Sequence, residues 1–485
     1  FLSGLFSQLP ERGGKKDVSM LTSRDMLTGL PVITAAAFFM QMLDSTILNT
    51  ALPSIAEAMH RSPFSMQLAV ISYTLTVALL IPLSGWLADT FGTRRTFLSA
   101  VTLFTVGSVL CAMSVSLPQL VAARVVQGIG GAMMVPVSRL TLMRAYTRED
   151  FVRVFNFITI PGLVGPVVGP IIGGWLVTYA SWHWIFLINL PLGLVGLVYA
   201  LRVFPDFRQP RGRFDVAGFL LIGLSVLALT AGVELTGGKS ASLTPVFVLA
   251  GTGVLAGAAY VYHARRFPTP LISLKVFATR TFSVGIAGNM VARLGIGSIP
   301  FLVPLMLQVG LEYSADVAGL IMLAPALGSI MTKTVVLRLL KRFGYRHVLL
   351  FLTLAIAGIF MLMGLQQPGW PLSLLVVQLL VQGMLMSGQF TAMNTITLGY
   401  LPPEHASDGN SLLSVSQNLC ISFGVAISTA LLRFYSGGAS ELHALHSTFV
   451  TVALITAASA FVFMFLRPDD GDHLLGRGQA AGKKA

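Results

Sequence analysis

Two ionisable residues stand inside long apolar stretches of this 485-residue chain. Asp44 lies in the apolar run 27–51 and Arg124 in the run 118–141. An apolar environment favours the neutral acid, whereas a nearby cation favours the carboxylate. Asp44 beside Arg124 could therefore bind and release a proton as its access to water changes, which is the usual role of such groups in membrane helices. The alternatives are that Asp44 caps or snorkels at a helix end and that Arg124 only ties helices together.

Other side chains in these runs could contact a small molecule. Gln127 lies one helical turn from Arg124, on the same face. Thioethers and aromatic rings suit a pocket that accepts varied hydrophobic compounds, although they also serve as core packing. Arg293 and Lys333 each need a carboxylate, a carbonyl or water, which the sequence does not identify. The candidate cavity residues are Met40, Gln41, Asn49, Gln127, Asn156, Arg293, Gln382, Gln389, Phe390 and Asn394.

The elements that position these residues must be membrane helices. The chain is 54% hydrophobic and 11% charged, against about 25% charged residues in ordinary globular proteins. Its apolar stretches are continuous runs, as in membrane helices, rather than the alternating segments of a barrel. We expect an all-α polytopic membrane protein with helices at 27–51, 66–88, 97–116, 118–141, 152–179, 183–203, 216–235, 243–263, 282–309, 314–337, 347–366, 371–398, 407–432 and 443–466.

The basic residues set the expected orientation. With the N-terminus inside, 26 of the 32 Lys and Arg residues fall in the cytoplasmic loops and tails and 3 fall outside. Since basic residues stay on the cytoplasmic side, both termini are expected there. The net charge of +13 then reflects orientation and contact with anionic lipid, and no nucleic acid partner is expected.

A repeat divides the chain into two halves. Phe91-Gly92-Thr93-Arg94-Arg95 recurs as Phe343-Gly344-Tyr345-Arg346-His347, and Val126-Gln127-Gly128 recurs as Val381-Gln382-Gly383. Duplicated six-helix bundles with a site near the midplane are typical of transporters. The run 264–281 reads as an amphipathic interfacial segment. We expect a cytoplasmic tail at 1–26 (with a native start at Met20 or Met26), a six-helix bundle at 27–203, an inserted transmembrane hairpin with basic flanks at 204–281, a second bundle at 282–466 and a cytoplasmic tail at 467–485.

Two further motifs concern helix packing and gating. In the loop after the second run, Gly85 permits close helix approach, and Asp89 can cap a helix or pair with an arginine to hold an inner gate shut. The same loop carries Gly92, Arg94 and Arg95, the arginines also serving as positive-inside anchors. In the fifth run, small residues four apart open a face for packing while prolines kink the helix. That motif comprises Gly165, Pro166, Gly169, Pro170, Gly173 and Gly174.

These motifs resemble a known family. Five segments occur in its order: 43–53, 85–95, 124–131, 162–174 and 182–193. They resemble the fourteen-span drug:proton antiporter branch of the major facilitator superfamily. The resemblance implies two six-helix bundles with an inserted two-helix hairpin, fourteen transmembrane helices in all, and proton coupling at Asp44. It also implies that the glycine–proline run marks antiporters and lines the interface that rearranges. Thr90 departs from the family pattern, which usually has a basic residue there.

We therefore expect a proton-coupled efflux transporter for lipophilic, cationic compounds, working by alternating access in the bacterial inner membrane. The alternatives are an exporter of one physiological metabolite, or a transporter-derived receptor or facilitator. An ATP-driven pump is disfavoured because Val233 stands where a phosphate loop needs its first glycine. No enzyme motif and no metal site are expected, and protons replace any cofactor. Expected partners are a hydrophobic small molecule and the lipid bilayer, with a monomeric chain and a periplasmic adaptor as an open possibility.

Overall fold

The computed structural model describes residues 29–61, 66–210, 213–236, 243–436 and 440–475. All regular elements in these ranges are helices, as the apolar runs predict. Twelve helical segments of the described residues are long and apolar enough to cross a membrane. The chain is therefore an all-helical, multi-span membrane protein, while the count of fourteen crossings stays a prediction.

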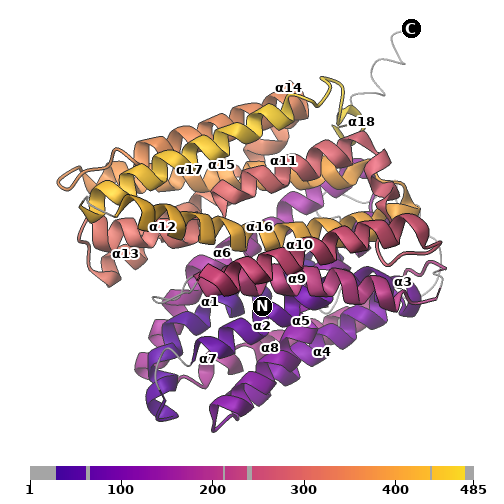
Figure 1. The fold of residues 1–485 in the computed structure, drawn as a ribbon, viewed down its shortest axis with the longest axis horizontal. Helices are drawn as coiled ribbons and strands as arrows, with labels where there is room; N and C mark the ends of the chain where they lie inside the picture. The colour runs from indigo at the N-terminus through magenta and orange to yellow at the C-terminus, as the bar shows by residue number, and fades with distance from the viewer. Residues whose placement is uncertain (1–28, 62–65, 211–212, 237–242, 437–439, 476–485) are drawn as a thin grey trace, which may run out of the picture.

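The first half of the chain forms one bundle, drawn in indigo to magenta in Figure 1. Prolines at the first turns of α1 and α5 suit helix starts because they need no backbone donor there. Thr147 caps α6 by accepting a hydrogen bond from the Asp150 amide, at 3.2 Å. The helices of this bundle are α1 (Leu30–Ala58), α2 (Gln67–Leu80), η3 (Ile81–Leu83), α3 (Ser84–Phe91), α4 (Thr93–Ala112), α5 (Leu117–Ala145), α6 (Arg148–Tyr179), α7 (Trp184–Leu187) and α8 (Asn189–Val203).

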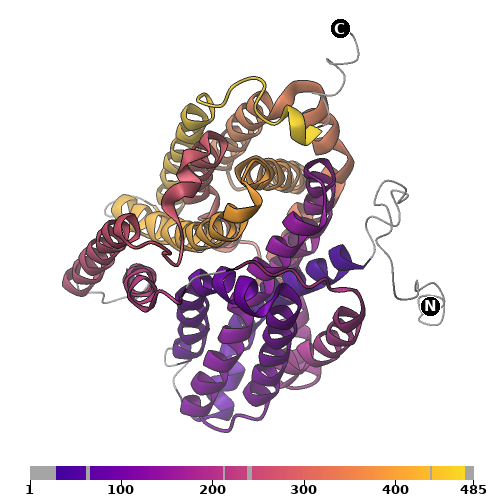
Figure 2. The same ribbon diagram turned by 90° about the vertical axis from the view of Figure 1, so that its right-hand side faces the viewer.

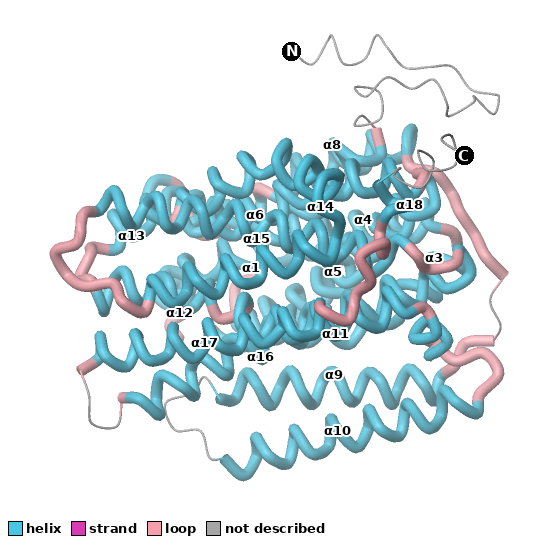
Figure 3. Tube along the Cα trace, turned by 90° about the horizontal axis from the view of Figure 1, so that it is seen from above, coloured by secondary structure: helices cyan, strands magenta, loops and turns pink. Residues whose placement is uncertain are grey.

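A helical hairpin follows, made of α9 (Val216–Thr236) and α10 (Leu243–Arg266). Helix α9 packs against α2 of the first bundle and α16 of the second, and α10 lies on its outer side (Figures 2 and 3). Asp215 joins the two ends of the hairpin. Its carboxylate accepts the Gly218 amide at 2.8 Å, the Leu271 amide at 3.1 Å and His263 Nε2 at 2.8 Å.

The segment after the hairpin, expected to be an amphipathic interfacial segment, contains η4 (Leu274–Ala278). Its residues Leu271, Ile272 and Val276 are buried in the protein core. The Tyr260 hydroxyl fixes this segment because it donates to the Ile272 carbonyl at 2.8 Å. Phe267 and Phe277 are exposed, so protein covers only part of the apolar pattern, and contact of the rest with the membrane interface stays a prediction.

The second half forms the other bundle, orange to yellow in Figure 1. The expected loop 338–346 is reduced to one bend within α14, where Gly344 has φ 76° and ψ 168°. The elements are α11 (Arg280–Ile296), α12 (Ile299–Leu305), the π-helical turn η5 (Met306–Gly310), α13 (Ala315–Ile321), α14 (Leu323–Met363), α15 (Leu372–Gly399), η6 (Pro403–His405), α16 (Ala406–Tyr435), α17 (Glu441–Phe463) and α18 (Asp472–Leu475).

The repeat seen in the sequence has a matching backbone. Gly92, between α3 and α4, has φ 95° and ψ 147°, close to the values at Gly344. A side chain is strained at such positive φ, so glycine is required at both bends. A Cβ at Gly92 would also lie 2.1 Å from Asp206 Oδ1. The chain therefore bends at equivalent points of the two halves, at a glycine with positive φ in each.

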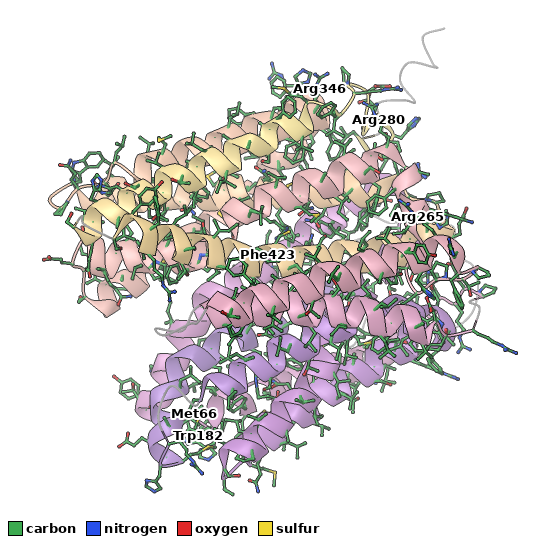
Figure 4. All side chains as sticks on the ribbon, viewed as in Figure 1. Met66, Trp182, Arg265, Arg280, Arg346 and Phe423 are labelled. Atoms are coloured by element: carbon green, nitrogen blue, oxygen red, sulfur yellow. The ribbon has the colours of Figure 1, made fainter. Side chains whose placement is uncertain are left out.

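The two ends of the molecule differ in how the bundles meet. At the end that carries the basic loops, one apolar core is shared, with Phe282 and Leu398 packed together with residues of the first bundle. At the other end each bundle has its own core, one within 47–188 and one within 296–453. Figure 4 shows Arg265, Arg280 and Arg346 towards the first end, and Met66 and Trp182 towards the second. The bundles are thus joined at the basic end.

Candidate functional site

Asp44 and Arg124, predicted to pair, form a buried ion pair between α1 and α5. Arg124 Nη1 lies 2.7 Å from Asp44 Oδ2, and both side chains are 1% exposed. Arg124 Nη1 also donates to Gln127 Oε1 at 2.7 Å, and Gln127 Nε2 donates to Asp44 Oδ1 at 2.7 Å. Such short contacts are typical of charge-assisted hydrogen bonds. Gln127, a predicted cavity residue, is therefore part of this network.

Three more helices complete the network. Asn189 Nδ2 of α8 donates to Asp44 Oδ1 at 3.2 Å, and Ser108 of α4 accepts from Gln127 Nε2 at 2.8 Å. On α2, the Ala69 carbonyl accepts from Arg124 Nε at 3.2 Å, and the Tyr73 ring lies 4.2 Å from the guanidinium carbon. The sequence did not predict these partners. Asn189 and Ser108 were visible only as polar residues within apolar runs, which gives no distance to Asp44, and the Ala69 carbonyl gave no signal at all.

The expected gating loop is mostly helical, because Gly85 and Asp89 belong to α3 and Arg94 and Arg95 to the first turn of α4, with only Gly92 between the two helices. Asp89 Oδ1 lies 2.6 Å from Arg144 Nη2, so the predicted carboxylate–arginine pair exists, within one bundle. Gly85 makes the approach to the second bundle, because a Cβ there would lie 2.4 Å from Ser407 Oγ. Arg94 donates to the Leu201 carbonyl and to Asp206, and Arg95 is exposed.

The glycines of α6 pack against α1. A Cβ at Gly165 would lie 2.9 Å from Met42 Cβ, and one at Gly169 would lie 2.3 Å from Thr46 Oγ1. Gly173 is buried, but the space beside Gly174 is open. The described glycines thus pack α6 against α1 within the first bundle, and the rearrangement of this interface during transport stays a prediction. The Pro166 and Pro170 side chains lie outside the described residues.

Polar contacts cross between the bundles nearer the basic end. Asn410 Nδ2 donates to the Pro136 carbonyl at 2.7 Å, and Gln209 Nε2 donates to the Pro403 carbonyl at 3.1 Å. The Arg148 guanidinium carbon lies 5.7 Å from the centroid of the Tyr400 ring. Burial raises the pKa of Tyr400, so its hydroxyl stays neutral at physiological pH.

The other predicted cavity residues are buried but only partly gathered. Phe390 of α15 stacks on Phe155 of α6 with centroids 6.2 Å apart, and Arg293 lies over Phe390 at 4.8 Å. Thr391 donates to Asn156 Oδ1 at 3.3 Å, also across the boundary. The other predicted cavity residues that the structure describes are also buried, in one bundle or the other. They are Met40, Gln41, Gln382, Gln389 and Asn394.

Some predicted residues do not face the boundary or are not described. Gln389 donates to Thr353 of α14 at 2.9 Å, inside the second bundle, and Gln382 contacts Met386 of its own helix. The side chains of Asn49 and Lys333 lie outside the described residues.

Arg139 is the main residue that the sequence analysis misplaced. It lies at the end of the expected helix 118–141, but we counted it among the cytoplasmic basic residues of 139–153. The structure instead places it within α5, only 4% exposed, with its guanidinium carbon 5.7 Å from the centroid of the Phe155 ring. The sequence did not reveal its burial because the positive-inside count treats all basic residues near a helix end alike.

Comparison with known proteins identifies the family. The sequence profile of the Major Facilitator Superfamily matches residues 34–269 and 285–483. The chain belongs to this superfamily. It is 47% identical over 447 residues to the provisionally named multidrug resistance protein MdtD of Cronobacter sakazakii, covering 90% of this chain and 94% of that protein. The MdtD of Escherichia fergusonii is 46% identical over 440 residues, covering 89% and 93%.

Solved structures agree on the fold. The proton:xylose symporter XylE, bound to 6-bromo-6-deoxy-D-glucose, superposes with a TM-score of 0.67 at 14% identity, covering 95% of this chain and all of that chain. At this identity the likeness shows the major facilitator fold alone. The family and its relatives are transporters rather than enzymes, so the buried network at Asp44 belongs to a transport protein.

Proposed function

We propose that this protein is a proton-coupled exporter of hydrophobic compounds in the bacterial inner membrane, with Asp44 as the proton-binding group. The observation that carries the proposal is the Asp44 network. Its carboxylate accepts hydrogen bonds from Arg124, Gln127 and Asn189, all in the interior of one bundle. An intramembrane carboxylate held in this way is an expected place for proton exchange.

The proposed orientation follows from the basic end. That end is cytoplasmic by the positive-inside rule, which puts both chain termini there. Two further crossings bring the twelve apolar segments to the proposed fourteen. One is α6, and the other consists of α13 and the part of α14 before Gly344. The shared core at the proposed cytoplasmic end and the separate cores at the other end support the proposal of an outward-facing state.

The proposed transport cycle couples protonation of Asp44 to opening of the cytoplasmic end. The proposed cycle starts with the Asp44 carboxylate compensated by Arg124, whose Nη1 lies 2.7 Å away. A proton arriving from outside neutralises the carboxylate, which weakens its hold on Arg124 and Gln127. The freed donors alter the packing of α1 against α5 and favour opening at the cytoplasmic end. Substrate that enters there displaces the proton inward, and export follows.

The test is transport in proteoliposomes under an imposed pH gradient, with wild type beside Asp44→Asn. Permanently charged naphthalene derivatives of either sign serve as fluorescent probes. We expect gradient-driven transport in the wild type and its loss in Asp44→Asn, because the amide cannot exchange a proton.

The matched control is Asp469→Asn, which removes an exposed carboxylate at the basic end. It should transport as the wild type does. Equal gradient-driven transport by Asp44→Asn and the wild type would contradict the proposal and move proton exchange to another residue.

A further inference from the structure

An aromatic stack lies where the two bundles meet, and an arginine flanks each side of it. Phe155 of α6 and Phe390 of α15 come from opposite bundles and stack with centroids 6.2 Å apart and planes at 14°. Phe38 of α1 extends the stack, 6.5 Å from Phe390. Arg139 lies over Phe155 at 5.7 Å, and Arg293 lies over Phe390 at 4.8 Å.

Neither arginine is compensated by a carboxylate of the described residues. Arg139 is 4% exposed and Arg293 is 6% exposed, and neither makes an ion pair within the described part of the chain. Arg139 Nη1 and Arg293 Nη2 are buried without a hydrogen-bond partner there. The one described hydrogen bond is from Arg293 Nε to Asn289 Oδ1, at 2.6 Å.

The contrast with Arg124 shows what is missing. Arg124 is equally buried, but Asp44 neutralises it and three acceptors satisfy it. Aromatic faces attract a guanidinium only weakly compared with the cost of burying an unpaired charge. Two such cations on one boundary also repel each other. The site is therefore short of negative charge and of hydrogen-bond acceptors.

We propose that Arg139 and Arg293 bind the acidic group of an aromatic organic anion, a carboxylate or a sulfonate, whose ring packs on the Phe155–Phe390 stack. The planar fork of a guanidinium matches the oxygens of such groups. The proposal rests on the proposed export function and names its substrate class. It replaces the expected cationic substrate, because a cation at this boundary would be repelled by both arginines.

The placement also links binding to conformational change. Arg139 belongs to the first bundle and Arg293 to the second, so their repulsion opposes closure of the bundles around the stack. An anion between them removes that repulsion and favours the closed arrangement. Substrate of the opposite charge would not do this.

The test uses two permanently charged probes that share one ring system, 1-naphthalenesulfonate and trimethyl(1-naphthylmethyl)ammonium. The first measurement is the rise in Tm that each probe causes in the purified wild-type protein. We expect the sulfonate to raise the Tm and the ammonium compound to have no effect. In proteoliposomes the sulfonate alone should be transported.

Variants assign the effect to the two arginines. Arg139→Gln and Arg293→Gln should each weaken sulfonate binding at least tenfold, read from the concentration dependence of the Tm rise, while Arg293→Lys keeps part of it. The probe-free Tm of the Gln variants should equal or exceed that of the wild type, since an uncompensated buried charge is removed. Arg342→Gln is the control, because Arg342 also lies over an aromatic ring, that of Phe343, but is exposed.

The outcomes separate this proposal from the proposed function. Gradient-driven transport of the ammonium probe instead of the sulfonate would overturn the anion site and leave proton-coupled export standing. Sulfonate binding that needs both arginines, without gradient-driven transport, would uphold the site and refute the export function. A lower probe-free Tm with unchanged sulfonate binding in both Gln variants would show that the arginines are structural and overturn the proposal.

Discussion

At the scale of single residues, the described helices contrast Arg124, which is paired with Asp44, with Arg139 and Arg293, which have no carboxylate partner among the described residues. The sequence predicts the Asp44–Arg124 pair because two opposite charges in membrane helices of one bundle must find each other. It does not predict Asn189 or Ser108, whose polarity carries no information about distance. Arg139 was hidden in the same way by its place near a helix end. The position of a charged residue can be predicted within an apolar run, where charges are rare. It cannot be predicted near a helix end, where basic residues are common.

One prediction concerns how Asp44 and Arg124 depend on each other. Arg124→Gln leaves a buried carboxylate without its cation and should destabilise the protein by about 3–5 kcal/mol. The double variant Asp44→Asn, Arg124→Gln removes both charges and should recover most of that loss. Thermal unfolding of the wild type, both single variants and the double variant measures the coupling. Additive losses would show that the pair contributes no interaction.

At the scale of elements, glycines decide where helices bend and where they touch. The repeat 91–95 and 343–347 predicts equivalent turns, and Gly92 and Gly344 share one positive-φ conformation. The sequence could not predict that the second turn would be a single residue within α14, because a basic stretch reads as a loop. Likewise, small-residue spacing predicts close packing of α6 but not that its partner is α1.

Gly85 should control how closely the bundles meet at the basic end. A Cβ there meets Ser407 and Ser411 of α16 at 2.4 and 2.7 Å, so Gly85→Val should push the bundles apart and favour the inward-facing state. Gly174→Val is the matched control, since no atom lies within 4 Å of its Cβ position. Spin labels at Arg95→Cys and Arg467→Cys, both exposed positions, report the separation. A longer distance with Gly85→Val only is expected, and an unchanged distance would refute this role.

Asp215 should hold the hairpin α9–α10 in place. Asp215→Ala removes the helix cap and the bonds to Leu271 and His263, which should cost about 2–4 kcal/mol. The expected result is a lower Tm and faster proteolysis after residue 266, compared with the exposed control Asp469→Ala. A Tm equal to that of the control would show that helix packing alone fixes the hairpin.

At the scale of the whole molecule, the two bundles share a core at one end and have separate cores at the other. The all-helical fold, the family and the duplication could be predicted from apolar runs and motifs. The conformational state could not, because inward- and outward-facing arrangements bury the same helix faces within each bundle. The expectation of a cationic substrate did not take Arg139 into account, because that arginine had been counted among the cytoplasmic loop residues.

The charge moved in each cycle follows from the proposed substrate. An anion leaving in exchange for one entering proton moves two charges in the same electrical direction, whereas a cation exchanged for one proton moves none. Each charge contributes about 2.3 kcal/mol per 100 mV. A potassium–valinomycin potential, negative on the side from which 1-naphthalenesulfonate leaves, should therefore accelerate its transport without a pH gradient. A rate independent of the potential would argue against anion:proton exchange.

The central claim is that Asp44 carries the proton that is exchanged for substrate. The most direct measurement is proton movement driven by a 1-naphthalenesulfonate gradient alone, followed with a pH-sensitive dye trapped in proteoliposomes. The wild type should move protons against the flow of the probe, and Asp44→Asn should carry the probe without moving protons. Proton movement by Asp44→Asn at the wild-type rate would contradict the claim.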